Sequence, residues 1–104
     1  MFLILWEFDV KRGSEKEFES IYGPNGDWAQ LFRLDPGYQS TSLLRDISRV
    51  HVYLTCDFWK SREAYESFRR NHLDVYLALD KKCGELTIAE RKIGAFEQIE
   101  DEHP

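Results

Sequence analysis

The sequence lacks any long hydrophobic run. Its most apolar stretch, Phe2-Leu3-Ile4-Leu5-Trp6, is followed at once by Glu7. A signal-peptide core needs roughly 7–15 apolar residues behind a basic start, and a transmembrane helix needs about 20. We therefore interpret this stretch as a strand and expect a cytoplasmic protein with no membrane partner.

Cysteine and basic charge are also scarce. The two cysteines, Cys56 and Cys83, make neither a disulfide framework nor a zinc site. The histidines at positions 51, 72 and 103 lack the spacing of metal ligands, so we expect no metal. The 14 basic and 19 acidic residues give a net charge of −5 without a basic stripe. Nucleic acid is therefore a disfavoured partner.

Aromatic residues, in contrast, are abundant in a chain of only 104 residues, with 3 Trp, 5 Tyr and 7 Phe. This length is typical of a single domain, 1–104, with one core and room for one pocket. The rings predict either an aromatic core or a ring-lined pocket or subunit interface.

Periodicity and turn residues predict a β-α-β-β-α-β order, which is the ferredoxin-like α+β arrangement of one four-stranded antiparallel sheet with helices on one face. A Ser14/Glu17 capping box starts the first helical layer, which breaks into two pieces around 23–26. The second helix runs from Ser61 to about residue 80 with a kink at Asn71-His72. The strands are expected at 2–10, 38–46, 50–58 and 91–99, and the acidic tail 100–104 is expected to fray.

Such a sheet leaves one face uncovered. In the third strand we assign every second residue from Val50 to Phe58 to the helix-covered face. Its alternate set, which includes Tyr53 and Trp59, is mixed in polarity and is assigned to the open face. A mixed aromatic face suits a subunit interface, so we expect a homodimer. A monomer with a solvated sheet face is the alternative.

Several segments together resemble the antibiotic biosynthesis monooxygenase family. They are Trp6-Glu7-Phe8, Gly13-Ser14, Tyr22-Gly23-Pro24 with Gly26-Asp27-Trp28, Pro36-Gly37-Tyr38, Leu43-Leu44-Arg45-Asp46, Trp59 with Ser61, Glu63-Ala64-Tyr65 and Phe68, and Ile93-Gly94-Ala95-Phe96. The resemblance covers about residues 2–97. It implies a dimeric α+β barrel and oxidation of a small aromatic, polyketide or quinone-type compound without metal, flavin or other cofactor. A non-catalytic protein of the same fold that binds a small hydrophobic ligand is the alternative.

The sequence argues against heme breakdown, which is another activity of this family. The heme-degrading members use an Asn on the first strand, a Trp on the second helix and a His about ten residues later. This chain instead has Trp6-Glu7-Phe8, Phe68 and Ala78-Leu79 at those places.

Cofactor-free oxygenation needs a base, hydrogen-bond donors near the developing negative charge and a dry pocket. His72 is our candidate base because histidine is the residue type suited to proton transfer near neutral pH and because it lies on the apolar stripe of the second helix. Asn71, Tyr76 and the Trp28 indole are the candidate donors. Structural roles, a helix histidine and a core ring, are the alternatives for His72 and Trp28. Further candidate ligand-binding residues are Phe68, Tyr53 and Glu7, with Arg45 as the expected partner of Glu7.

Overall fold

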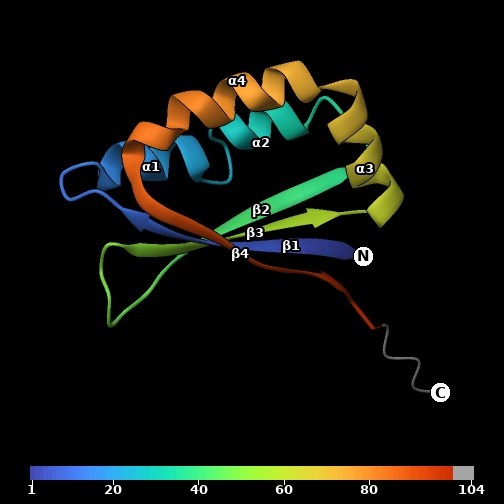
Figure 1. The fold of residues 1–104 in the computed structure, drawn as a ribbon. Coiled ribbons are helices and arrows are strands. Elements are labelled where there is room, and N and C mark those ends of the chain that lie inside the picture. Colours follow the sequence, from blue (N-terminus) through green and yellow to red (C-terminus); the bar gives the residue numbers. More distant parts are fainter. Residues whose placement is uncertain (100–104) are drawn as a thin grey trace.

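The structure, a computed structural model, describes residues 1–99, so the tail 100–104 lies outside it. Four strands and four helices follow one another, with a short 3-10 turn before the last strand (Figure 1). Their bounds are β1 Phe2–Val10, α1 Glu15–Tyr22, α2 Asp27–Phe32, β2 Tyr38–Arg45, β3 Val52–Trp59, α3 Arg62–Asn71, α4 Leu73–Cys83, η1 Gly84–Leu86 and β4 Thr87–Glu97.

The strands form one antiparallel sheet in the order β2-β3-β1-β4. All helices lie over the same face of this sheet, as Figure 1 shows. The ferredoxin-like α+β prediction is therefore confirmed. The last strand begins four residues before the predicted start, because η1 occupies only 84–86 and the chain enters the sheet at Thr87.

Both predicted breaks in the helical layer are present. A turn over 23–26 separates α1 from α2, and a Cβ added to Gly26 would lie 2.3 Å from the Ile21 carbonyl oxygen, so only glycine fits this turn. At the second break His72 ends α3 and begins α4. Ser61 caps α3, since its Oγ accepts a hydrogen bond from the Ala64 amide at 3.1 Å.

The predicted capping box at Ser14 does not form. The Ser14 side chain makes no cap hydrogen bond, and its backbone lies at φ −103° and ψ 5° rather than in the extended region that a capping residue adopts. The Glu15 carboxylate instead accepts a hydrogen bond from the Gly13 amide at 2.6 Å. The helix therefore starts where predicted, but with another contact.

The predicted faces of the third strand are wrong. Tyr53 is 2% exposed and Trp59 is fully buried, and both lie under the helices rather than on the open face. The register explains this placement, because Asp57 stands opposite the buried Ile4 of β1 and therefore shares its face. Both sets of β3 side chains are apolar enough to be buried, so alternation alone could not assign them.

The open face of the sheet consequently carries aliphatic side chains, two phenylalanines and a cysteine. On it Leu5 stands opposite Cys56, and Leu3 stands opposite Phe58, all of them half-buried. Leu44 is 52% exposed, and Phe96, which stands opposite Leu3 in β4, is 47% exposed. This face is more apolar than solvent-exposed sheet faces usually are. Within residues 1–99, no helix has the length and apolar character needed to cross a bilayer.

Candidate functional site

A cavity of about 50 Å³ lies between the helix-covered face of the sheet and helices α2 and α4. Aromatic rings make up most of its wall, which is formed by Trp6, Phe8, Tyr22, Trp28, Phe32 and Tyr76. The rings come from β1, α1, α2 and α4, so the cavity exists only when these three helices are packed on the sheet. Its volume is enough for a few water molecules.

Polar groups complete the wall. Thr41, Thr55 and Asp57 come from the sheet and are buried, whereas Asp80 of α4 and Glu90 of β4 are exposed. The cavity therefore reaches solvent between α4 and β4, and its inner end is formed by the sheet.

Asp57 is the buried carboxylate of this cavity, with only 9% of its surface exposed. Burial raises the pKa of its carboxyl to about 6, against the smaller opposing effect of a hydrogen bond from Thr41. The Thr41 hydroxyl donates that bond to Asp57 Oδ1 at 2.7 Å. No Lys, Arg or His forms an ion pair with Asp57 within residues 1–99.

A second hydroxyl extends this contact away from the cavity. The Tyr38 hydroxyl lies 2.7 Å from Thr41 Oγ1. Because Thr41 gives its one hydroxyl hydrogen to Asp57, Tyr38 donates to Thr41. Asp57 is thus held by a chain of two hydrogen bonds that ends at a buried tyrosine.

The Trp28 indole supplies a donor that has no acceptor. Trp28 is 7% exposed, and its Nε1 is buried without a hydrogen-bond partner. The Tyr22 hydroxyl and the Cys83 thiol are nearby, but neither completes a hydrogen bond with it. A buried donor without a partner is costly, and an acceptor in the cavity would remove that cost.

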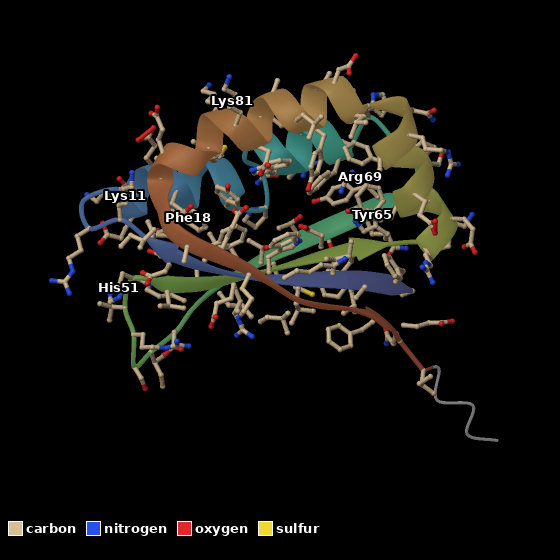
Figure 2. The ribbon with its side chains drawn as sticks, viewed as in Figure 1. Lys11, Phe18, His51, Tyr65, Arg69 and Lys81 are labelled. Atoms are coloured by element: carbon tan, nitrogen blue, oxygen red, sulfur yellow. The ribbon has the colours of Figure 1, made fainter. Side chains whose placement is uncertain are left out.

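Two predicted site residues are brought together at this cavity. Trp28 and Tyr76 both line it and meet edge to face, with ring centroids 5.1 Å apart. Burial raises the pKa of Tyr76 to about 12, so its hydroxyl stays protonated near neutral pH. Arg69 lies over the Tyr76 ring at 4.2 Å, and it also donates to the Tyr65 hydroxyl (Figure 2).

The other predicted catalytic residues do not line the cavity. His72 sits at the α3–α4 junction, half-buried, with its ring centroid 5.4 Å from that of Phe68. Asn71 is exposed and donates to the Ser67 hydroxyl of its own helix at 3.3 Å. Phe68 is fully buried among Phe32 and Trp59 and belongs to the core.

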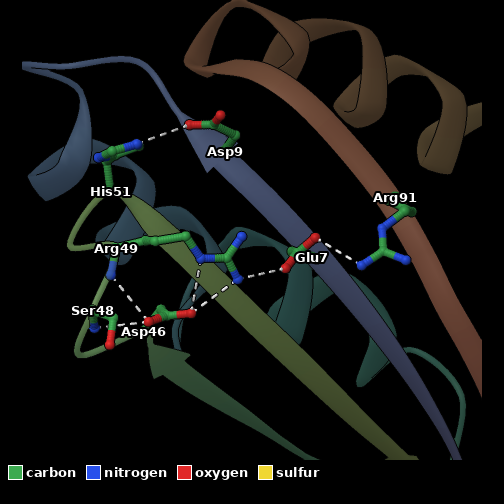
Figure 3. Close-up of polar contacts among 7 residues, drawn as sticks. All are labelled: Glu7, Asp9, Asp46, Ser48, Arg49, His51 and Arg91. Carbon is green, nitrogen blue, oxygen red and sulfur yellow. Dashed lines mark hydrogen bonds and ion pairs between the residues drawn. The ribbon is translucent and has the colours of Figure 1, made fainter.

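The predicted ligand-binding residues of the sheet are also separate from the cavity. Tyr53 packs on Phe18 and donates to the Glu19 carboxylate. Arg45 is exposed and is not the partner of Glu7. Glu7 instead binds Arg49 and Arg91, at 3.2 and 3.0 Å, on the open side of the sheet (Figure 3). Those arginines lower the pKa of Glu7, which is the ordinary effect of surface ion pairs.

Sequence reasoning missed Asp57, Thr41 and Thr55. The signal was present, because Thr55 and Asp57 are polar residues inside an otherwise apolar strand. The inverted face assignment placed them on the open side, where polar residues need no explanation. Burial also raises the pKa of the Cys83 thiol, which is buried at the end of α4.

The fold and this cavity together define a class: a small α+β protein with a ring-lined site under its helices and a buried carboxylate within it. The model of one family, described as antibiotic biosynthesis monooxygenase, matches residues 1–73. The chain belongs to this family. No match is found among proteins of curated function.

Several solved structures have the same fold. SnoaB, a cofactor-independent oxygenase from Streptomyces nogalater, is 21% identical, with a TM-score of 0.76 and coverage of 97% of this chain and 95% of SnoaB. Rv0793 from Mycobacterium tuberculosis is 15% identical, with a TM-score of 0.68 and 98% coverage of both chains. A MhuD mutant with two manganese protoporphyrin IX molecules bound per active site is 18% identical, with a TM-score of 0.68 and 100% coverage of both chains. At these identities the likeness establishes the fold alone.

Proposed function

We propose that this protein is a cofactor-independent monooxygenase that oxidises a small aromatic compound, a phenol, hydroquinone or anthrone, in the cavity under its helices. The observation that carries the proposal is the Asp57 carboxylate, which is buried at the sheet end of a ring-lined cavity and has a pKa of about 6. A base with such a pKa is mostly deprotonated at neutral pH and still basic enough to accept a proton. The oxygenase SnoaB shares the fold, which makes this chemistry the natural one to test.

The reaction begins when Asp57 takes a proton from the phenol or enol. The resulting electron-rich anion passes electrons to dioxygen, and a carbon–oxygen bond forms. Return of the proton gives a hydroperoxide, which loses water and leaves a carbonyl. For an anthrone, one CH₂ group and one O₂ become one C=O group and one H₂O, so atoms and electrons balance without another reductant.

The Trp28 indole stabilises the anion in this scheme. Its unpartnered Nε1 hydrogen is available to an oxygen that gains negative charge during the reaction. Such a donor, fixed in place before the reaction, favours the transition state over the neutral ground state. The Tyr76 hydroxyl is protonated near neutral pH and can serve as a second donor, because Tyr76 also lines the cavity.

A substrate ring needs more room than the closed cavity offers, because ligand pockets generally enclose about 300–1,000 Å³. Helix α4 is the part of the wall that can move. Its one buried residue is Cys83 at its C-terminal end, and its Tyr76 and Leu79 are only partly buried. We propose that displacement of α4 admits the substrate and that its return excludes water from the anion.

We also propose that the protein is a homodimer in which a second copy covers the open face of the sheet. The half-buried Leu5, Cys56 and Phe58 and the exposed Leu44 and Phe96 form an apolar surface of the kind that dimers bury. The cavity lies on the other face of the sheet. Dimer formation therefore leaves its mouth between α4 and β4 available to substrate.

Oxygen uptake measured with a panel of hydroquinones and anthrones tests the function. The wild-type rate should rise with pH through about 6, and Asp57→Asn should lower kcat by about 10²–10⁴-fold. His72→Ala should retain the wild-type rate because His72 does not line the cavity. Asp74→Asn, an exposed position of α4, is the control for surface charge.

Two outcomes would contradict the proposal. An Asp57→Asn variant with full activity would remove Asp57 as the base. Binding of the panel without oxygen uptake would identify the protein as a non-catalytic protein that holds a small hydrophobic ligand.

A further inference from the structure

The mouth of the cavity is acidic. Asp80 of α4 and Glu90 of β4 both line it, and they are its exposed lining residues. With Asp57 at the inner end, the wall carries three carboxylates and no Lys, Arg or His. Neither Asp80 nor Glu90 forms an ion pair within residues 1–99.

The two mouth carboxylates lie close enough to repel each other. Burial raises the pKa of Glu90, and the charge of Asp80 raises it further. A cation between them would relieve this repulsion. The neighbouring Lys81 does not do so, because its side chain points away from the sheet on the outer side of α4 (Figure 2).

Arg69 of α3 is also occupied. It lies over the Tyr76 ring and donates to the Tyr65 hydroxyl, and it is not part of the cavity wall. The cation that would suit the mouth is therefore supplied neither by Arg69 nor by the lysine that follows Asp80.

The interior independently points to a ligand of a definite kind. Trp28 is 7% exposed, lines the cavity and has an Nε1 hydrogen without an acceptor. The interior, with the Asp57 carboxylate from the sheet and the Trp28 indole from α2, thus suits a hydroxyl group, and the mouth suits a positive charge. Between them, the half-buried rings of Trp6 and Tyr76 line the wall, and such rings attract a cation as well as an aromatic group.

We propose that the substrate is a phenol that carries a positive charge, such as an alkylammonium group, with its hydroxyl directed to Asp57 and Trp28 and its cation held between Asp80 and Glu90. This inference rests on the proposed function, since it names the class of substrate for the same site. Phenols that carry a carboxylate are disfavoured by the same three acids.

Three phenols of nearly equal length and shape test the inference: tyramine, which is cationic, tyrosol, which is neutral, and 3-(4-hydroxyphenyl)propanoate, which is anionic. Their dissociation constants are measured by calorimetry on the full chain at low salt. Exposed ion pairs are individually weak, so two of them together should make tyramine bind about tenfold more tightly than tyrosol. The anionic phenol should bind most weakly, and added salt should reduce the differences.

Matched variants assign the preference to the mouth. In the double variant Asp80→Asn/Glu90→Gln tyramine should lose its advantage over tyrosol, while tyrosol binding stays as in the wild type. Glu85→Gln, an exposed acid of η1 that does not line the cavity, should leave the preference intact. Equal binding of tyramine and tyrosol, binding of none of the three, or a preference that survives the double variant would overturn the inference.

Failure of this inference is distinguishable from failure of the proposed function. The titrations measure binding alone, whereas oxygen uptake measures turnover. If tyramine binds selectively but no cationic or neutral hydroquinone causes oxygen uptake, the proposed oxygenase activity is contradicted and the charge preference is supported. If only neutral hydroquinones cause oxygen uptake, the oxygenase activity is supported and the preference for a cationic substrate is contradicted.

Discussion

At Asp57 the requirements of ionisation and burial oppose each other. The folded chain holds the Asp57 proton with a pKa of about 6, whereas the ordinary value is 3.8. A group whose pKa is raised by folding stabilises the fold while it is protonated. Its contribution to the free energy of unfolding therefore falls as the pH rises from about 4 to 6 and stays low at pH 7.

Asp57→Asn should consequently stabilise the protein at pH 7 while it lowers the rate. The amide has no charge to bury and can still accept the hydrogen bond from Thr41. We expect a gain of about 1–3 kcal/mol in the free energy of unfolding at pH 7 and little change at pH 4. Urea unfolding at both pH values measures it, and Asp74→Asn is the control. A loss of stability of equal size at both pH values would contradict the account.

Two buried indoles offer a matched comparison of function and packing. Trp28 and Trp59 each have an Nε1 without a partner, but only Trp28 lines the cavity. Trp28→Phe should weaken the binding of a phenol about tenfold, because one hydrogen bond to the ligand is lost. Trp59→Phe should leave that affinity unchanged, although it alters the core. Tyrosol titrations compare the two variants, and equal losses of affinity would contradict a donor role for Trp28.

At the scale of the elements, the sequence predicted the order, type and approximate bounds of the strands and helices. The signals were local, namely the capping serine of α3, the glycines of the α1–α2 turn and the period of the apolar residues. The faces of β3 were not predictable in this way. Leu54, Cys56 and Phe58 look more apolar than Tyr53, Thr55 and Asp57, yet the latter lie under the helices.

The candidate site was only partly predictable for the same reason. Trp28 and Tyr76 emerged from helical spacing, and both line the cavity. Asp57 depends on which face of β3 meets the helices, and that is decided by strand register and by the packing of Tyr53 and Trp59. His72 appeared attractive from its chemistry, but the break between α3 and α4 places it outside the cavity wall.

Helix α4 should be the least protected of the long elements. Its residues before Cys83 are exposed or partly buried, whereas β1 is hydrogen-bonded to a strand on each side. Amides of α4 should therefore exchange with solvent faster than those of β1 and β3. Hydrogen exchange followed by mass spectrometry measures this, and a phenol that binds in the cavity should slow exchange in α4 most. Protection of α4 equal to that of β1 in the free protein would contradict its role as the moving wall.

At the scale of the whole molecule, the sheet divides the protein into two sides. One side holds the helices and the cavity, and the other holds an apolar surface that ends at the ion pairs of Glu7 with Arg49 and Arg91 (Figure 3). The sequence predicted a dimer from Tyr53 and Trp59, which are core residues. The apolar residues that a second copy would cover are instead Leu5 and its neighbours on the open face, such as Cys56 and Phe58.

Leu5→Glu should disrupt this dimer. Leu5 lies on the open face in a central strand, so a carboxylate there would be buried without a partner in the dimer. Light scattering coupled to size exclusion should give about twice 12.4 kDa for the wild type and 12.4 kDa for the variant. Leu73→Glu, at an exposed position of α4, is the control and should remain dimeric. A wild-type mass of 12.4 kDa at micromolar concentration would contradict the dimer.

The central claim is that Asp57 enables dioxygen to react with an aromatic substrate without a cofactor. Its most direct test is the reaction of chelator-treated protein with an anthrone under ¹⁸O₂, with mass spectrometry of the product. The account predicts one ¹⁸O atom in the new carbonyl for the wild type, and product no faster than the uncatalysed background for Asp57→Asn. A product formed at the same rate by both proteins, or a wild-type product without ¹⁸O, would contradict it.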